Sequence, residues 1–183
     1  MNSEQLALTG WGRTRPSVAS LVDISADELT QTGVLDRLDQ SGRGIIARGM
    51  GRSYGDPAQN GGGSVVRISD GKIEVNSARG SVRVGAGISL DTLLREIIPL
   101  GWFVPVTPGT RFVTVGGAIA ADIHGKNHHV DGSFGSHVEQ LTLLLADGTQ
   151  RLLSPTGEHA NLFWATVGGM GLTGIILDAT FSL

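Results

Sequence analysis

The sequence has no cysteine, few charged residues and no long hydrophobic run. Without cysteine it can form no disulfide, thiolate zinc site, iron–sulfur cluster or cysteine nucleophile. The 14 basic and 17 acidic residues give a net charge of −3 without any basic run, so nucleic acid is not an expected partner. No stretch approaches the roughly 18 apolar residues of a membrane span, and the N-terminus lacks the apolar core of a signal peptide. We therefore expect membrane contact, if there is any, to be peripheral.

Glycine is the residue in excess. It supplies 28 of the 183 residues against only 6 prolines, which fits neither collagen nor a Pro/Gly-rich linker. Hydrophobic residues make up 40% of the chain, which indicates a folded protein. The length predicts one domain, or two small lobes that share a core. We expect part of the glycine-rich backbone to serve as a binding surface.

Helix and strand patterns occur in groups instead of alternating strictly. Residues 25–38 begin with Ser25 and Glu28 in capping-box spacing and predict a short amphipathic helix, weakened by Gly33. Ser89 precedes apolar residues at helical spacing up to Pro99 and predicts a second helix. Strands are predicted at Ile45–Arg48, Ser64–Ile68, Lys72–Asn76, Ser81–Ala86, Phe103–Val106, Leu141–Ala146, Gln150–Leu153 and Gly174–Leu183, with a hairpin turn at Asp147-Gly148. The mixed order predicts an α+β fold and not a doubly wound sheet.

The first glycine-rich segment follows a predicted strand and has the spacing GxGxxxG. It comprises Ala47, Arg48, Gly49, Met50, Gly51, Arg52, Ser53, Tyr54, Gly55, Asp56 and Pro57. Its glycines allow positive φ and close ligand approach, so that backbone N–H groups converge on an oxyanion such as a pyrophosphate. The spacing is one residue longer than the dinucleotide fingerprint and no helix pattern follows, which excludes a Rossmann site. The alternative is a tight surface turn.

A second glycine-rich segment, Gly169–Gly174, matches GxGxxG but leads into a β-like run. Because the fingerprint requires a strand, a turn and then a helix, this match does not indicate a Rossmann site. Its glycines either let the backbone pass close to a flat cofactor or form a bulged entry to a strand.

The longest motif covers residues 108–129. Thr114 is a helix N-cap, and a short helix of small residues through Ala121 would direct free N–H groups and its dipole toward a second phosphate. His124 and His128 lie four residues apart, which raises a zinc site as an alternative. Since Gly125 follows His124 and the HExxH glutamate is missing, we expect no metal.

Four segments together resemble a known family: GRSYGD, PGTRFVTVGGAIAADIHGKNHH, GSFGSHV and FWATVGGMGLTGII. They are similar to the FAD-binding domain of the vanillyl-alcohol-oxidase, or PCMH-type, flavoproteins. Within that family they resemble more closely the oxidases that act on decaprenylphosphoryl ribose. The resemblance extends from Leu8 to about Thr180 and implies two α/β lobes with FAD between them.

The resemblance also implies roles for individual residues. The segment from Ala47 to Pro57 would hold the pyrophosphate of FAD. The rest of the cofactor would be lined by Gly109, Thr114, Val115, Gly116, Gly117, Ala121, Asp122, Ile123, His124 and Ile176. Tyr54, His124 and Lys126 would face the isoalloxazine or the substrate and act in catalysis. Relatives with covalent flavin carry a histidine where this sequence has Arg52, and no cysteine is present, so the FAD is expected to be non-covalent.

By the same resemblance, the expected reaction is oxidation of the 2′-hydroxyl of a polyprenylphosphoryl ribose to a ketone, the first half of an epimerisation that makes an arabinose donor for cell-wall arabinan. The expected partner is an NADH-dependent keto-sugar reductase, and the expected place is the cell envelope, with the cytoplasm left open. Residues 1–183 would form the FAD-binding domain, with the substrate domain and a C-terminal return segment outside this sequence. The alternatives are an alditol or aldonolactone oxidase, or a flavin-binding fragment without catalysis.

Overall fold

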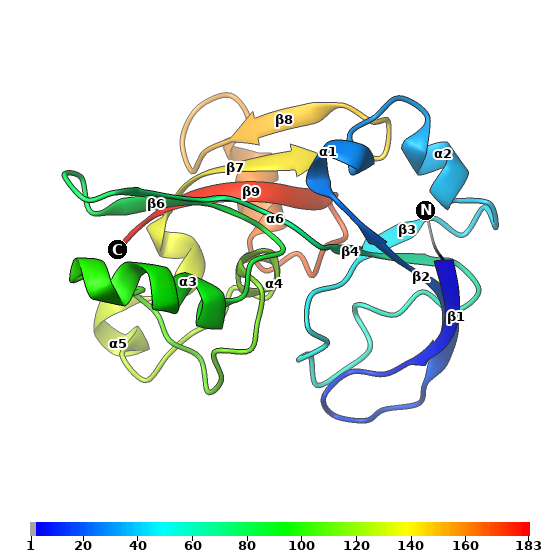
Figure 1. The fold of residues 1–183 in the computed structure, drawn as a ribbon, viewed down its shortest axis with the longest axis horizontal. Coiled ribbons are helices and arrows are strands. Elements are labelled where there is room, and N and C mark those ends of the chain that lie inside the picture. Colours follow the sequence, from blue (N-terminus) through cyan, green and yellow to red (C-terminus); the bar gives the residue numbers. More distant parts are fainter. Residues whose placement is uncertain (1–2) are drawn as a thin grey trace.

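The computed structural model describes residues 3–183 and contains two β-sheets (Figure 1). The first sheet has the strand order β1 (Ser3–Leu8), β2 (Ser17–Ile24), β4 (Ser64–Ile68) and β3 (Ile45–Ala47). Its strand β1 is antiparallel to β2, whereas β2 and β3 both run parallel to β4. The loop that leaves β3 therefore starts at the carboxyl end of the parallel strands, where ligands of such sheets commonly bind.

The second sheet is antiparallel throughout. It has the order β5 (Ile73–Asn76), β6 (Ser81–Gly85), β9 (Ile175–Ser182), β7 (Val138–Leu144) and β8 (Gln150–Leu153). The predicted turn at Asp147-Gly148 connects β7 to β8, and Gly148 has a φ of +80°. The last strand in sequence, β9, thus lies in the middle of the sheet.

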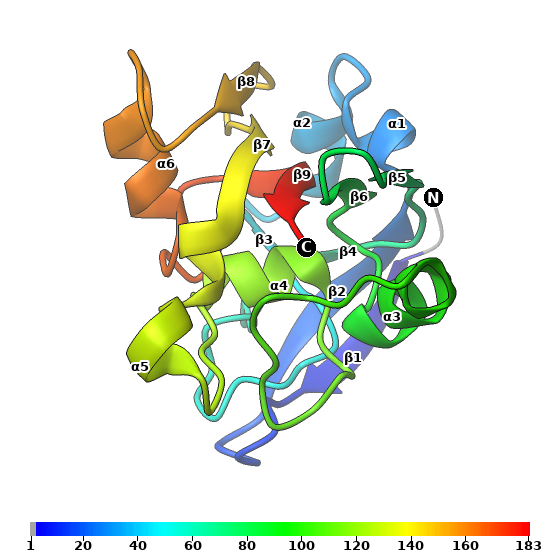
Figure 2. The ribbon, with the colours of Figure 1, turned by 90° about the vertical axis from the view of Figure 1, so that its left-hand side faces the viewer.

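Short helices connect and cover these strands. They are α1 (Ala26–Leu29), α2 (Val34–Leu38), α3 (Leu90–Ile97), α4 (Val115–Ala120), α5 (His128–Asp131) and α6 (Ala160–Thr166), with 3-10 turns η1 (Ile98–Leu100) and η2 (Phe134–His137). Figure 2 shows α4 beneath β9, with α3 to one side and α5 to the other. This arrangement places α4 at the centre of the molecule.

The hydrophobic core has two main parts. The larger part lies between the five-stranded sheet and the helices beneath it, and it fully buries Leu93, Ile119 and Phe181. The second part joins the two sheets, because Val66 of β4 belongs to the same cluster as Leu177 of β9. Burial of such side chains contributes about 1.5–3 kcal/mol each. The two sheets therefore share apolar contacts.

The α+β prediction is confirmed, but several element predictions are wrong. Residues 25–38 form two helices and not one, because Gly33 adopts a φ of +72° between them. Phe103–Val106 is not a strand, since the carbonyl of Pro105 accepts a hydrogen bond from the Asn127 side chain instead of from a neighbouring strand. The strands β1 and β2 were not predicted from the sequence.

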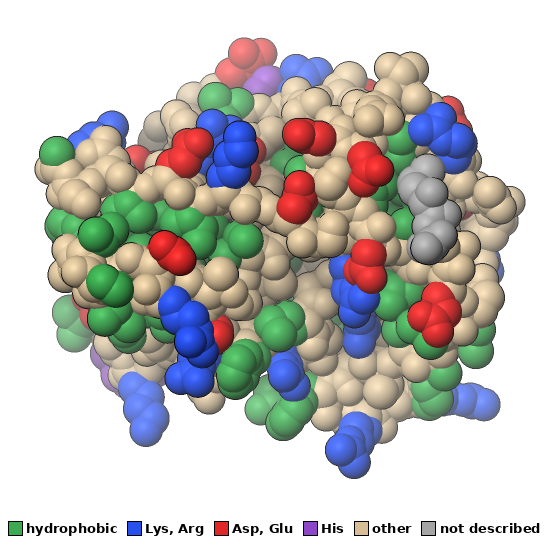
Figure 3. All heavy atoms as spheres, viewed as in Figure 1, with side chains coloured by type: hydrophobic (Ala, Val, Ile, Leu, Met, Phe, Trp, Pro, Cys, Tyr) green, Lys and Arg blue, Asp and Glu red, His purple; other side chains and the backbone are tan. Residues whose placement is uncertain are grey.

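Acidic and basic side chains are interspersed on the face drawn in Figure 3, and hydrophobic side chains gather at its left. Ile98, Leu100 and Phe103, at and after the end of α3, are each more than half exposed. Within the described part of the chain, no helix is long and apolar enough to cross a membrane.

Candidate functional site

The loop after β3 presents a row of backbone N–H groups without protein partners. Within residues 3–183, the N–H groups of residues 49–56 donate no hydrogen bond, although the preceding N–H of Arg48 donates to Val66 O at 2.8 Å. The loop is partly exposed, and Gly51 within it has a φ of +66°, which disfavours any side chain. Successive free N–H groups form a surface that binds anions. The phosphate-binding prediction for this segment is consistent with its geometry.

Gly49 brings this loop against the start of α4. A Cβ on Gly49 would lie 2.5 Å from Thr114 Oγ1, so glycine is required at this position by close packing. The Thr114 hydroxyl accepts a hydrogen bond from the N–H of Gly117 at 3.1 Å, as the N-cap of α4. The predicted cap and the predicted short helix are both confirmed. The first and the longest motif therefore meet at one contact.

The start of α4 is not an open anion site. The N–H groups of residues 115, 116 and 117 donate to Ile88 O, Ala86 O and the Thr114 hydroxyl, at 2.8, 2.9 and 3.1 Å. The expectation of free N–H groups at this helix terminus is wrong, because the turn after β6 packs against it. The unpaired donors belong to residues 49–56 instead.

The second glycine-rich segment packs on the other end of α4. The N–H groups of Met170 and of Gly168, the residue before the segment, donate to Ala120 O and Ile119 O, at 2.8 and 3.0 Å. A Cβ on Gly171 would lie 3.5 Å from the Ile46 side chain of β3. The segment is a turn between α6 and β9, with positive φ at residues 168, 170 and 171. All three glycine-containing motifs thus converge around α4.

Residues 122–126 form a tight turn beyond α4. Asp122 has a φ of +41°, and its carboxylate accepts a hydrogen bond from Gly135 N–H at 2.9 Å. His124 forms an isolated bridge with Ser133. Gly125 is buried, and a Cβ there would lie 2.8 Å from Thr107 O. His124 and Lys126, the two neighbours of the buried Gly125, are exposed.

The histidine rings of this region contact one another, edge to face between His124 and His128 and tilted between His128 and His129. The ring centroids of His124 and His128 are 5.3 Å apart, and those of His128 and His129 are 3.9 Å apart. The Nδ1 atom of His128 lies 2.9 Å from Gly125 O. Among residues 3–183, no group of at least three His, Cys, Asp or Glu side chains is arranged to hold a metal ion.

The remaining predicted residues occupy different environments. Tyr54 is 79% exposed, and its hydroxyl makes no hydrogen bond within the described residues. Gly109 is exposed, and the segment that follows it contacts the loop, because Arg52 Nε donates to Phe112 O at 3.1 Å. Ile176 is only 5% exposed and belongs to the core beneath β9, so its side chain has little surface to offer a ligand.

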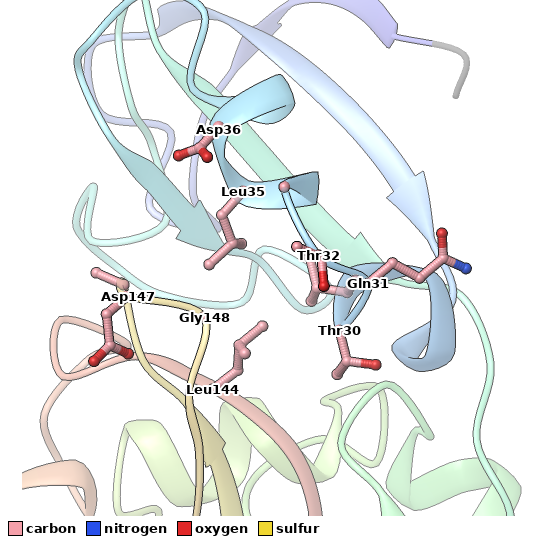
Figure 4. Close-up of a pocket in the computed structure, with 11 residues that line it drawn as sticks. Thr30, Gln31, Thr32, Leu35, Asp36, Leu144, Asp147 and Gly148 are labelled. Carbon is pink, nitrogen blue, oxygen red and sulfur yellow. The ribbon is translucent and has the colours of Figure 1, made fainter.

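A surface cavity of about 260 Å³ lies elsewhere, between the α1–α2 region and the β7–β8 turn (Figure 4). Leu35 and Leu144 line it, and Asp36 and Asp147 lie around its edge. Backbone N–H groups of residues 49–56 do not line this cavity. It is therefore separate from the site built around α4.

The sequence prediction missed a contribution from Thr9–Arg13. The N–H of Trp11 donates to Ser53 O at 2.7 Å, and the Arg52 guanidinium lies 4.8 Å from the Trp11 ring centroid. A Cβ on Gly10 would overlap Ser53 O, and one on Gly12 would overlap Tyr54 O. The alternate glycines of this segment were the available signal for close backbone packing.

Comparison with known proteins agrees with this geometry. The chain is 55% identical over 178 residues, or 96% of its length, to decaprenylphosphoryl-beta-D-ribose oxidase of Mycolicibacterium smegmatis. It is 27% identical over 97% of its length to alditol oxidase of a Streptomyces species, and 29% identical over 58% of its length to human Delta(24)-sterol reductase.

The chain spans 39% of the length of the mycobacterial oxidase, 42% of the alditol oxidase and 20% of the sterol reductase. A family model described as FAD binding domain matches residues 25–154. These residues include β3, the loop after it, α4 and the turn at residues 122–126. With the row of free N–H groups suited to a diphosphate, this match shows that the chain belongs to the FAD binding domain family.

Proposed function

We propose that this chain is the FAD-binding part of an oxidase that converts the 2′-hydroxyl of a polyprenylphosphoryl ribose to a ketone. The observation that carries the proposal is the row of free N–H groups at residues 49–56. A diphosphate offers several oxygens along one edge, and successive N–H groups can bind them together. Glycines at 49 and 51 keep side chains off this edge.

The FAD is held without a covalent bond. Arg52 occupies the place of the histidine that carries the flavin in covalent relatives, and a guanidinium is not a nucleophile at neutral pH. Its Nε is engaged by Phe112 O and its plane lies near the Trp11 ring. Arg52 therefore joins three segments around the cofactor.

The substrate class is supported by sequence identity. The 55% identity to an oxidase of decaprenylphosphoryl ribose is twice the 27% identity to an alditol oxidase, over nearly the same span. Bound FAD supplies a hydride acceptor for oxidation of a carbinol carbon. We assign removal of the hydroxyl proton to the Tyr54 hydroxyl, with the exposed His124 and Lys126 near the reacting sugar.

The proposal also covers the partner and the place of the reaction, on the strength of the family resemblance. A 2-keto sugar is a substrate for hydride addition, so an NADH-dependent reductase would complete the epimerisation. The enzyme pair would work at the cell envelope, where the polyprenyl chain of the substrate is held.

A chimera tests the proposed activity. This chain would replace the matching 39% of the Mycolicibacterium smegmatis oxidase, and flavin reduction by decaprenylphosphoryl ribose would be followed without oxygen. We expect the chimera to bind FAD and to be reduced by this sugar but not by free alditols. A matched chimera that carries the corresponding part of the alditol oxidase serves as the control.

Reduction by alditols alone would assign the chain to the alditol-type oxidases instead. A chimera that binds FAD but is reduced by neither substrate would indicate a flavin-binding module without this activity.

A further inference from the structure

The loop with the free N–H groups is held in place through its carbonyl groups. Ser53 O accepts from the N–H of Trp11 at 2.7 Å, and its peptide unit carries the N–H of Tyr54. Asp56 O accepts from the N–H of Gln59 at 3.1 Å and closes the end of the loop, where Pro57 has no N–H. Since the N–H groups of residues 49–56 make no internal bond, backbone pairing of the usual kind does not fix their direction. A peptide unit held by its carbonyl directs its N–H to the opposite side. The contact at Ser53 O therefore directs the N–H of Tyr54.

The Arg48 side chain makes further contacts at the ends of this loop. Its Nη1 donates to Ala58 O at 2.9 Å, at the far end of the loop, and its Nη2 donates to Thr9 O at 2.7 Å. A Cβ on Gly51 would overlap the same guanidinium, so the loop wraps closely around it. One side chain thus ties both ends of the loop to the segment that follows β1.

Arg48 forms no ion pair within the described residues, where the salt bridges involve other arginines. The group is partly buried, and desolvation together with the nearby charge of Arg67 lowers the pKa of Arg48. Burying an arginine against two carbonyls costs free energy that an exposed salt bridge does not. Such a cost is expected where the fork geometry of the guanidinium has a specific use.

We propose that Arg48 and residues 9–13 form a brace that holds the N–H groups of residues 49–56 in the direction needed to bind the FAD diphosphate. Arg48 is then a positioning residue and not a group that contacts the cofactor. This inference rests on the FAD binding of the proposed function. It predicts that the charge of Arg48 is not sufficient and that its two-carbonyl geometry is required.

Substitution by lysine separates geometry from charge. Arg48→Lys keeps the charge but cannot bridge two carbonyls with a planar fork, whereas Arg48→Met loses both. Because Arg48→Met loses both charge-assisted hydrogen bonds and Arg48→Lys loses at least one, we expect both variants to weaken FAD binding by about tenfold or more, measured by flavin fluorescence. Arg151→Met, an exposed change on β8, is the control and should bind FAD as the unaltered chain does. Wild-type affinity in Arg48→Lys would overturn the proposal.

A second variant breaks the brace from its other side. Gly10→Val would displace residues 9–13, because its side chain would overlap Ser53 O and Gly55 O, while Arg48 and the loop keep their composition. If both substitutions disable one brace, their effects should not add. The Kd of the double variant Arg48→Met/Gly10→Val for FAD should then lie within about twofold of the Kd of the single variant that binds FAD less tightly. Ala78→Val, in the exposed β5–β6 turn, controls for the added side chain. If the increase in Kd of the double variant equals the product of the increases in the two single variants, the two substitutions do not act on one brace.

Limited proteolysis without FAD tests the brace independently of cofactor binding. Loss of the brace should free the loop, so trypsin should cut after Arg52 faster in Arg48→Lys, Arg48→Met and Gly10→Val than in the unaltered chain. The fragment ending at Arg52 identifies this cut by mass. If the unaltered chain binds no FAD, the proposed function fails, and the cleavage rates still decide on the brace. Equal cleavage in all four proteins would overturn it.

Discussion

The contact between Gly49 and Thr114 gives a prediction whose size follows from the structure. A Cβ at position 49 would lie 2.5 Å from Thr114 Oγ1, but 3.4 and 3.5 Å from the other side-chain atoms of Thr114. The hydroxyl alone thus excludes alanine. Gly49 has no positive φ, so alanine brings no backbone strain there. The cost of Gly49→Ala comes from displacing the hydroxyl that caps α4.

The magnitude combines two effects of opposite sign. Overpacking and the disturbed cap together cost about 2–3 kcal/mol, and the lower entropy of the unfolded chain returns about 0.4–1 kcal/mol. The net loss of about 1–2.5 kcal/mol corresponds to a fall in Tm of about 2–10 °C for a domain of this length. Thr114→Ala alone should lose about 1 kcal/mol with the cap.

The double variant decides whether this reasoning is correct. In Thr114→Ala the hydroxyl is gone, so adding Gly49→Ala should leave the free energy of unfolding unchanged or raise it slightly. Urea unfolding of the four proteins of this cycle measures the coupling, which should be about 1 kcal/mol or more. Additive effects of the two substitutions would refute the steric explanation, and position 49 would then require glycine for some other reason.

Four further predictions concern the loop, the flavin linkage, the reaction and one ion pair. Gly51→Val places a side chain at a φ of +66° and against Arg48, so this variant should lose FAD while its far-UV circular dichroism spectrum remains that of a folded protein. Acid precipitation of the unaltered chain should release all flavin into the supernatant, because the FAD is not covalently bound. In the chimera, Tyr54→Phe should slow flavin reduction by about a hundredfold or more at unchanged FAD content, and an unchanged rate would remove Tyr54 from proton transfer. The hydrogen bond from Arg67 lowers the pKa of Asp23 in the folded state. The pair therefore stabilises the fold at pH values above the unfolded pKa of Asp, about 3.9. The difference in free energy of unfolding between the unaltered chain and Arg67→Met should disappear as the pH falls from about 5 through the lowered pKa. Both side chains are about half exposed, so that gain should be below about 1 kcal/mol, and a gain that persists in acid would exclude the pair as its source.

The helices that bear on the site could be predicted because their signals are local. Ser89 and Thr114 each cap a helix through a bond to a residue three positions later, and this spacing is visible in the sequence. The capping box at Ser25 and Glu28 is present as well. The break at Gly33 was underestimated, since the sequence does not state that its φ is positive.

Contacts between distant segments could not be read in this way. The N–H groups that begin α4 are bonded to Ala86 and Ile88, nearly thirty residues away, so a helix terminus that looked open is closed. Strand β1 was missed because most of its residues are exposed and it lies at the edge of its sheet, where the apolar pattern is weak. The sequence thus located the loop whose N–H groups have no partner in the described chain, but not the contacts that hold it.

The central place of β9 determines when during synthesis this domain can form. Strands β6 and β7 each pair with β9 but not with one another, so the five-stranded sheet stays in two halves until residues 175–182 have left the ribosome. Pairing of strands so far apart in sequence is slow compared with local hairpins. Helix α4, which supports the loop of residues 49–56, packs beneath β9. We therefore expect FAD to bind only after this domain has been translated, and not while it is being synthesised.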